Sequence, residues 1–285
     1  MTARRALVTG AHGRIGRVLL PRLEAAGFEV VATSHSGTHR LDLADDASIR
    51  SAVAAARPDV VVNLGGVVGA ACAADPELAH QVNVVGAVTL ATAARDAGAS
   101  LVVQASTAAV YGTDADAVLD EDAPLDGRGA YADSKREAED RLAAEATPGF
   151  TTVSARIFNV WGADFPDSLV ARLARSAAAG AVELHGWTRF VRDYIHVDDV
   201  AGALAGVAAA DAAALPPAVN VATGEGTSNE ELVAVLHQAG ITPVYRVTGD
   251  AAGWSRGDVT RLRALGVTPQ ALGSPLSRER VLALR

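Results

Sequence analysis

The stretch Thr9-Gly10-Ala11-His12-Gly13-Arg14-Ile15-Gly16 decides the fold of this chain. It follows a short apolar run, residues 6–8, and it opens an Ala/Leu-rich segment, residues 16–26, that has helical character. Glycines let such a turn fold tightly and approach a pyrophosphate, which then lies on the free N–H groups at the helix start. The Gly-x-x-Gly-x-x-Gly spacing is one residue wider than in most dinucleotide folds. A plain strand-to-helix turn is the alternative, but the strand–turn–helix context favours cofactor binding.

The end of the second predicted strand bears on which cofactor is used. NAD sites usually carry an acid there, and this chain has Ser34 instead. With no carboxylate to repel it, a 2′-phosphate can be accommodated, and Arg14, His35 or Arg40 could pair with it. The alternative is that these are solvated loop residues and that the site takes NAD. The sequence favours NADP over NAD.

Outward from the turn, short Val/Leu runs alternate with Ala-rich helical stretches, the pattern of a parallel sheet. Predicted strands span 6–8, 29–33, 60–63, 101–106, 151–158 and 218–221; predicted helices span 16–26, 47–56 (capped by Asp45 or Asp46), 80–97, 131–146 and 229–238. After about Asn159 the pattern becomes irregular. We predict a Rossmann-type doubly wound α/β fold, with a dinucleotide-binding domain over 1–158. Residues 159–285 are expected to form mainly a smaller, interleaved substrate lobe, of which about 191–238 packs back on the first domain.

Composition narrows the function classes. The 285 residues carry a net charge of −8 without a block of like charge, which argues against a nucleic-acid-binding surface. The single cysteine, Cys72, allows no disulfide framework within one chain, and the seven histidines lack metal-ligand spacing, so no metal site is expected. The apolar run after Arg4 and Arg5 is too short for a signal peptide, and no stretch reaches the ~20 residues of a membrane span. We expect a cytoplasmic protein with no membrane partner.

One lysine, Lys135, stands among 25 Lys+Arg residues, so the other 24 are arginines. It follows Tyr131 by four positions, which places both side chains on one face of a predicted helix. A phenol is a poor acid–base group at neutral pH, and a neighbouring ammonium, together with an oxidised nicotinamide ring, is expected to lower its pKa. An ordinary exposed ion-pair position is the alternative. The pairing of the only lysine with a tyrosine favours a catalytic role.

Hydroxyl groups follow the fourth predicted strand, in Ser106 and Thr107. Ligands of open α/β sheets bind outside the carboxyl ends of the strands, so Thr107 is expected to hydrogen-bond a reacting carbonyl oxygen, whereas Ser106 is expected to be structural. A Ser-His-Asp hydrolase is not supported, because the chain has no Gly-x-Ser-x-Gly turn.

Seven motifs in order resemble those of the extended short-chain dehydrogenase/reductases, the family of nucleotide-sugar epimerases, dehydratases and 4-ketoreductases. They cover nearly the whole chain: 9–16, Asn63-Leu64-Gly65-Gly66, Asn83-Val84-Val85-Gly86, Ser106-Thr107-Ala108-Ala109-Val110-Tyr111-Gly112, Tyr131-x-x-x-Lys135, 156–162 and 192–200.

This resemblance implies a nicotinamide cofactor, a nucleotide-sugar substrate, and a homodimer paired through the helices that start near His80 and Tyr131. It implies Thr107, Tyr131 and Lys135 as the catalytic residues. The predicted cofactor-binding residues are Gly10, His12, Gly13, Arg14, Ile15, Gly16, Ser34, His35, Arg40, Asp42, Leu43, Leu64, Gly65, Gly66, Asn83, Tyr131, Lys135 and Phe158, with Asp42-Leu43 at the adenine. The predicted substrate residues are Asn159, Arg192, near the substrate's diphosphate, and Arg256.

Departures from the family's motifs reduce the number of family reactions that we expect of this chain. Ala108 and Ala109 stand where the family's dehydratases carry acids, and Cys72 lies outside the position of the fucose-synthase cysteine. We therefore expect a ketoreductase that uses NADPH to reduce a 4-keto-deoxyhexose. A 4-epimerase with retained NAD is the alternative, and a non-catalytic cofactor-binding scaffold is less favoured, because a scaffold has no reason to keep Tyr131 and Lys135.

Overall fold

The structure of the chain is a computed structural model that describes residues 3–35, 39–112 and 117–284. The chain divides into two compact units, each built from three separate stretches. The first unit comprises Met1–Val110, Leu125–Arg156 and Ala201–Val219, and the second comprises Tyr111–Pro124, Ile157–Val200 and Asn220–Arg285. The stretch that returns to the first unit is therefore 201–219, and the short stretch 111–124 belongs to the second.

A six-stranded sheet forms the centre of the first unit, in the order β10-β5-β4-β3-β1-β2. Its strands are β1 (Arg5–Thr9), β2 (Glu29–Ala32), β3 (Val60–Asn63), β4 (Leu101–Thr107), β5 (Thr151–Ile157) and β10 (Ala218–Val221). The pairs β1–β2, β1–β3 and β3–β4 are parallel. From β1 the chain moves outward to β2 and then returns to the other side as β3. This reversal is the topological switch point at which open α/β sheets bind ligands.

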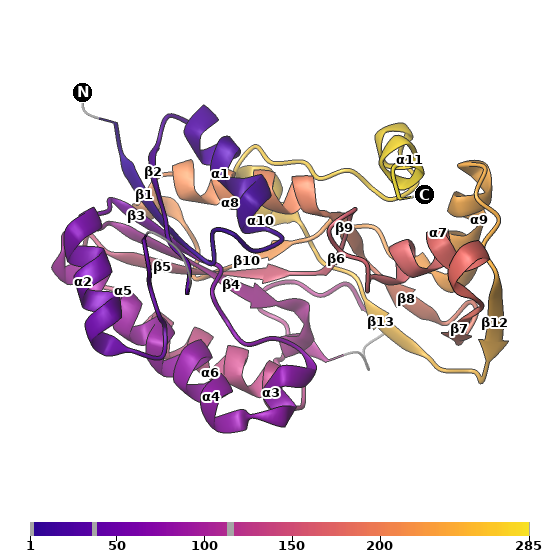
Figure 1. Ribbon diagram of the computed structural model, residues 1–285, viewed down its shortest axis with the longest axis horizontal. Helices are drawn as coiled ribbons and strands as arrows, with labels where there is room; N and C mark the ends of the chain where they lie inside the picture. The colour runs from indigo at the N-terminus through magenta and orange to yellow at the C-terminus, as the bar shows by residue number, and fades with distance from the viewer. Residues whose placement is uncertain (1–2, 36–38, 113–116, 285) are drawn as a thin grey trace. The chain divides into compact units, whose positions relative to one another are not determined.

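Helices cover both faces of this sheet (Figure 1). One face carries α2 (Asp46–Ala56), α5 (Ala87–Asp96) and α6 (Ala130–Ala144), and the other carries α1 (Gly16–Ala25) and α8 (Val197–Ala209). Leu7, Val61 and Leu90 are fully buried within the core between the sheet and α2 and α5. Asp45, one of the two residues predicted as the cap, caps α2 by accepting hydrogen bonds from the backbone N–H groups of two first-turn residues. The predicted doubly wound α/β class is confirmed.

The predicted single helix 80–97 is wrong in one respect. The structure has α3 (Ala70–Ala74), α4 (Pro76–His80) and a π-helical turn, η1 (Gln81–Gly86), before α5 begins. A Cβ on Gly86 would lie 2.1 Å from the carbonyl oxygen of Leu43, so only glycine lets the helix pack this closely. The wider turn carries Asn83, which hydrogen-bonds the backbone of Val67. Such turns often mark functional sites, and periodicity alone does not reveal them.

The second unit holds three small sheets, ordered β11-β8-β13, β12-β7 and β6-β9. Their strands are β6 (Asn159–Trp161), β7 (Val182–His185), β8 (Phe190–Arg192), β9 (Tyr194–His196), β11 (Thr227–Ser228), β12 (Tyr245–Thr248) and β13 (Gly253–Ser255). The helices of this unit are α7 (Leu169–Ala179), α9 (Asn229–Gln238), α10 (Thr260–Ala264) and α11 (Pro275–Leu282). Of the two short 3₁₀ turns, η3 (Ala212–Ala214) belongs to the first unit, and η2 (Ala108–Tyr111) lies where the chain passes from the first unit to the second. Trp161, Leu173 and Leu232 are fully buried in its core. Within the described residues, no helix is both long and apolar enough to cross a membrane.

Candidate active site

The glycine turn after β1 has no room for a side chain at Gly10 or Gly16. Gly10 has a φ of 60°, and a Cβ there would lie 3.0 Å from backbone atoms of Leu64 and Gly65. A Cβ on Gly16 would lie 2.4 Å from the carbonyl oxygen of Ala11. The turn therefore packs directly against the segment that follows β3, and its backbone leads into α1. A dinucleotide pyrophosphate fits this arrangement, because backbone N–H groups at a helix start bind anions.

A cavity of about 390 Å³ opens at the carboxyl ends of β1, β2 and β3 in the first unit. It is lined by Thr9, Gly10, Gly13, Ser34, His35, Leu41, Asp42, Leu43, Leu64, Gly65, Gly66, Val67 and Val82. We refer to it as the cofactor cavity. Nine of the predicted cofactor-binding residues line it: Gly10, Gly13, Ser34, His35, Asp42, Leu43, Leu64, Gly65 and Gly66.

Several other predicted cofactor residues lie beside the cofactor cavity. His12 lies 3.0 Å from the Ser34 hydroxyl through its Nδ1. Arg14 is exposed, while Ile15 is half-buried at the N-cap of α1. Asn83 accepts from the Val67 N–H at 2.8 Å and donates to the Val67 carbonyl at 2.9 Å. Asn83 therefore holds the loop after β3 in place.

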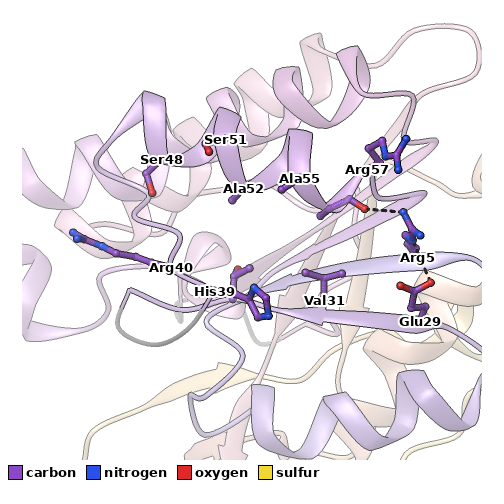
Figure 2. Close-up of a pocket in the computed structure, with 12 residues that line it drawn as sticks. Arg5, Glu29, Val31, His39, Arg40, Ser48, Ser51, Ala52, Ala55 and Arg57 are labelled. Atoms are coloured by element: carbon purple, nitrogen blue, oxygen red, sulfur yellow. Dashed lines mark hydrogen bonds and ion pairs between the residues drawn. The ribbon is translucent and has the colours of Figure 1, made fainter.

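Described residues after β2 line two cavities: Ser34, His35 and Asp42 line the cofactor cavity, and His39 and Arg40 line a second one. Arg40 lies 3.4 Å from the Asp42 carboxylate, and His35 lies 3.3 Å from the same oxygen. A hydrogen bond from the Ala44 backbone, followed by His35 and Arg40, holds the pKa of Asp42 below its usual value. Arg40 itself lines a neighbouring cavity of about 570 Å³ between β2 and α2, where it points away from the Arg5 end (Figure 2). The charge of Asp42, in the cofactor cavity, is thus partly offset by the Arg40 guanidinium.

The three predicted catalytic side chains meet at the carboxyl end of β4. Thr107 ends that strand and hydrogen-bonds the hydroxyl of Tyr131, from the first turn of α6. Lys135, one turn further along α6, donates from Nζ to the Ala105 carbonyl at 3.0 Å. A Cβ on Gly66 would lie 3.4 Å from this Nζ. The lysine therefore lies next to the wall of the cofactor cavity.

Burial controls the protonation of both α6 residues. Lys135 is only 3% exposed, and loss of hydration lowers its pKa to about 8, against the opposing effects of Cys72 and Glu139. Burial also raises the pKa of Tyr131, and the hydrogen bond with Thr107 only partly opposes this. The expectation that the lysine lowers the tyrosine's pKa is thus wrong for the protein alone, because desolvation of the phenolate is the larger effect.

Beneath these residues lies a buried network that the sequence analysis missed. Glu139, on the same face of α6 as Lys135, accepts from Nε and Nη2 of Arg156 on β5 and from the hydroxyl of Ser106 on β4. Ser106 is thus structural, as expected. The sequence shows a glutamate one helical turn after Lys135, but it does not show that Glu139 pairs with an arginine 17 residues further along the chain. Among the described residues, no group of three His, Cys, Asp or Glu side chains is placed to hold a metal ion.

The second unit has its own cavity, of about 490 Å³, which we call the lobe cavity. It is lined by Asn159, Val160, Asp167, Ser168, Leu169, Arg172, Glu183, Leu184, His185, Phe190, Arg192, Tyr194 and Asn229. Two of the predicted substrate residues, Asn159 and Arg192, are in this set. The Nη1 group of Arg192 donates to the carbonyls of Val191 and Gly253 at 2.8 and 2.9 Å, and the guanidinium lies 3.8 Å from the centre of the Phe190 ring.

The third predicted substrate residue, Arg256, donates from Nε to the Gly224 carbonyl at 2.8 Å. The predicted cofactor residue Phe158 is buried in the second unit, where a Cβ on Gly257 would lie 3.0 Å from its ring. Asp193 is fully buried, accepts hydrogen bonds from the backbones of Thr223, Gly224 and Gly257, and has a pKa that burial raises to about 6. Asp193 thus holds the backbone of Gly224, whose carbonyl accepts from Arg256, and that of Gly257, which follows Arg256 in the chain.

The cofactor cavity lies at the switch point of the sheet, beside a glycine turn that starts a helix and beside the Tyr131–Lys135 pair. This combination is that of a dinucleotide-binding α/β enzyme. Residues 6–222 match the sequence model of the NAD dependent epimerase/dehydratase family, and the chain belongs to that family of enzymes. The resemblance to the extended short-chain dehydrogenase/reductases is thereby confirmed.

Relatives of two activities are similar to the chain. A dTDP-4-dehydrorhamnose reductase of Streptomyces griseus is 36% identical over 72% of this chain and 67% of its own length. A UDP-glucose 4-epimerase of Erwinia amylovora is 31% identical over 87% of this chain and 88% of its own.

Solved structures that resemble the chain contain either NAD or NADPH. The UDP-glucose 4-epimerase of Thermus thermophilus in complex with NAD has a TM-score of 0.82 at 29% identity, covering 99% of both chains. RMD from Pseudomonas aeruginosa complexed with NADPH has a TM-score of 0.79 at 26% identity, covering 99% of this chain and 98% of the other.

Proposed function

We propose that the protein is a nucleotide-sugar ketoreductase that uses NADPH to reduce the 4-keto group of an activated deoxysugar. The observation that carries this proposal is the wall of the cofactor cavity after β2. Ser34 and His35 line it where NAD sites usually present a carboxylate, and Asp42 is already paired with Arg40. Such a wall admits a 2′-phosphate. NADPH that exchanges freely suits a reductase, because each turnover consumes one.

The pKa of Tyr131 fits proton donation. Because burial raises that pKa, the phenol is protonated at neutral pH and can give its proton to the oxygen of a reduced carbonyl. Thr107, already hydrogen-bonded to Tyr131, is positioned to hold the same oxygen. Lys135 stands one turn away, anchored on the Ala105 carbonyl, and its charge stabilises the phenolate that forms. The nicotinamide cofactor supplies the hydride.

Arg192, Asn159 and Arg256 are proposed to bind the substrate, with Arg192 on its diphosphate. Arg192 is preorganised, since two carbonyls and the Phe190 ring hold its guanidinium. Only the Nη1 group makes hydrogen bonds to the described part of the chain. The Nε and Nη2 hydrogens are therefore available to an anionic ligand. A homodimer paired through the helices near His80 and Tyr131 remains part of the proposal.

A 4-epimerase that retains NAD is the second candidate. The observation that favours it is the likeness to a UDP-glucose 4-epimerase structure over 99% of both chains. An epimerase must keep its reduced cofactor bound and let the keto intermediate rotate in the site. A reductase instead releases the oxidised cofactor.

The stoichiometry of the cofactor separates the two candidates. The purified protein is incubated with a 4-keto-6-deoxy nucleotide sugar and NADPH, and separately with UDP-glucose or UDP-N-acetylglucosamine without added cofactor. Consumption of one NADPH per product molecule supports the reductase. Conversion of a UDP-sugar into its C4 epimer without net cofactor change refutes it and establishes the epimerase.

A further inference from the structure

The cavity of about 570 Å³ between β2 and α2 shares no lining residue with the cofactor cavity. We call it the β2–α2 cavity. Its wall on β2 is the face that carries Glu29, Val31 and Thr33, since alternate residues of a strand share one face. Its wall on α2 is a flank of serines and alanines, among them Ser48 and Ala55. These short side chains leave the space between helix and strand open, and its volume is within the range of small-molecule sites.

The β2–α2 cavity is positively charged, although the whole chain carries a net charge of −8. Three arginines line it, Arg5, Arg40 and Arg57, against one carboxylate, that of Glu29. Glu29 lies 3.2 Å from Nε of Arg5 and so offsets that charge, and Arg40 lies 3.4 Å from Asp42. Figure 2 shows Arg5 and Arg57 at one end of the cavity and Arg40 at the other. Each end therefore offers a cation to a ligand.

Arg57 is the cation that these contacts leave unpaired. Within the described residues, its side chain makes no hydrogen bond or ion pair. It is the C-cap of α2 with a φ of 45°, and among the described residues it is the one non-glycine with a positive φ. Glycine or asparagine usually takes such a left-handed position, because a Cβ is disfavoured there. The arginine therefore suits the end of the helix poorly, while it adds a guanidinium to the cavity.

We propose that the β2–α2 cavity binds an elongated organic anion that has an acidic group at each end, one held by Arg57 and the other by Arg40. The apolar middle of this ligand lies on Ala52 and Ala55. The flank of α2 runs from Ser48 to Arg57, about 13 Å at the helical rise of ~1.5 Å per residue, which sets the length of the ligand. The site is the same whether the protein is a reductase or an epimerase, because the cofactor cavity contributes no residue to it.

The test titrates isotope-labelled protein, saturated with NADPH and separately without cofactor, and follows the backbone amide signals by NMR. The probes are azelate, a long dicarboxylate; succinate, a short one; and nonanoate, which has the azelate chain with a single carboxylate. Azelate is expected to shift the amide signals of Ala52 and Ala55 in both samples. Its Kd should be at least about tenfold lower than that of either other probe, because only azelate reaches a cation at each end.

Arg57→Gly is expected to weaken azelate binding at least about tenfold, because it removes the unpaired cation. It should leave the Tm unchanged or higher, because glycine suits the left-handed backbone, so that a loss of binding is not a loss of folding. Arg50→Ala is the matched control. It removes an arginine that pairs with Asp46 on the same helix and does not line the cavity, and it should keep the affinity for azelate.

Azelate that shifts no amide signal of α2, or that binds no better than succinate or nonanoate, overturns the inference. So does an azelate affinity that survives in Arg57→Gly, or one that falls equally in Arg50→Ala, which would be a general effect of charge on this helix. Displacement of azelate by NADPH overturns it as well, because the cations would then belong to the cofactor site.

Discussion

Glu139 accepts two hydrogen bonds from Arg156 through one carboxylate oxygen, Oε2, at 2.9 Å from Nε and 2.7 Å from Nη2. Both side chains are less than a tenth exposed. The pair joins α6 to β5, and Ser106 joins the other carboxylate oxygen to β4. Because Thr107 follows Ser106 and Lys135 precedes Glu139 by one helical turn, this pair braces the helix and the strand that carry the proposed catalytic groups.

Glu139→Gln is expected to destabilise the protein by about 3–5 kcal/mol, since it leaves the Arg156 charge buried and uncompensated. The free energy of unfolding is measured by urea denaturation. Glu137→Gln is the control: it removes the exposed carboxylate that contacts Arg141 and His80, on the same helix as Glu139, and it should cost less than about 1 kcal/mol. Equal losses in the two variants would contradict the bracing role of Glu139.

Tyr131→Phe removes the proposed proton donor and is expected to lower kcat by at least ~10²-fold. Lys135→Arg keeps the charge but should be severely impaired as well, because the wider guanidinium does not fit beside Gly66 and Ala105. Initial rates of NADPH oxidation measure both effects, and circular dichroism checks that the variants fold. A Lys135→Arg enzyme with most of its activity would show that the lone lysine has no special task.

The rate of carbonyl reduction is expected to fall as the pH rises through about 8, because burial lowers the pKa of Lys135 to about 8. Below this pH the ammonium is present and can stabilise the phenolate of Tyr131; above it the charge is lost. The measurement is a profile of initial rate against pH with saturating NADPH. The residual activity of Lys135→Arg should lack this break, because a guanidinium stays charged. A wild-type rate that stays level up to about pH 10 would argue against a catalytic ammonium.

The wild type is expected to bind NADPH more tightly than NADH, and Ser34→Asp should shift the preference toward NADH, because a carboxylate repels the 2′-phosphate and can hold the ribose hydroxyls. Competitive titration, followed by nicotinamide fluorescence, measures the ratio of the two dissociation constants. Ser51→Asp, on α2 in the neighbouring cavity, adds the same charge outside the cofactor cavity and should leave the ratio unchanged. Equal or tighter binding of NADH by the wild type would refute the NADP assignment.

The sequence predicted the elements of the first unit closely, because each is signalled locally. Strand 60–63 is buried on both faces and is a continuous Val run, and β3 spans those same residues. The sequence offers Asp45 or Asp46 as the cap from their place before the helix, and Asp45 caps α2. The π-helical turn at 81–86 could not be predicted, since it depends on Gly86 meeting the Leu43 carbonyl from a distant part of the chain.

The site was predictable where chemistry follows spacing. Tyr131 and Lys135 are four residues apart on one helix, and the glycine turn has its own pattern. The Glu139–Arg156 pair depends instead on burial and on two side chains that only folding brings together. The same holds for the pKa of Tyr131, where the amount of desolvation, which a sequence does not state, outweighs the neighbouring charge.

The interleaving of the two units limits which segments of this enzyme could be exchanged with those of a homologue. The stretch 201–219 supplies most of α8 and the start of β10 to the first unit, although it lies between two stretches of the second. A crossover that exchanged everything after residue 157 for a homologue's tail would replace an edge strand of the sheet together with the lobe. New substrate preferences in such a chain are therefore expected to arise by point changes within the lobe rather than by exchange of the whole lobe.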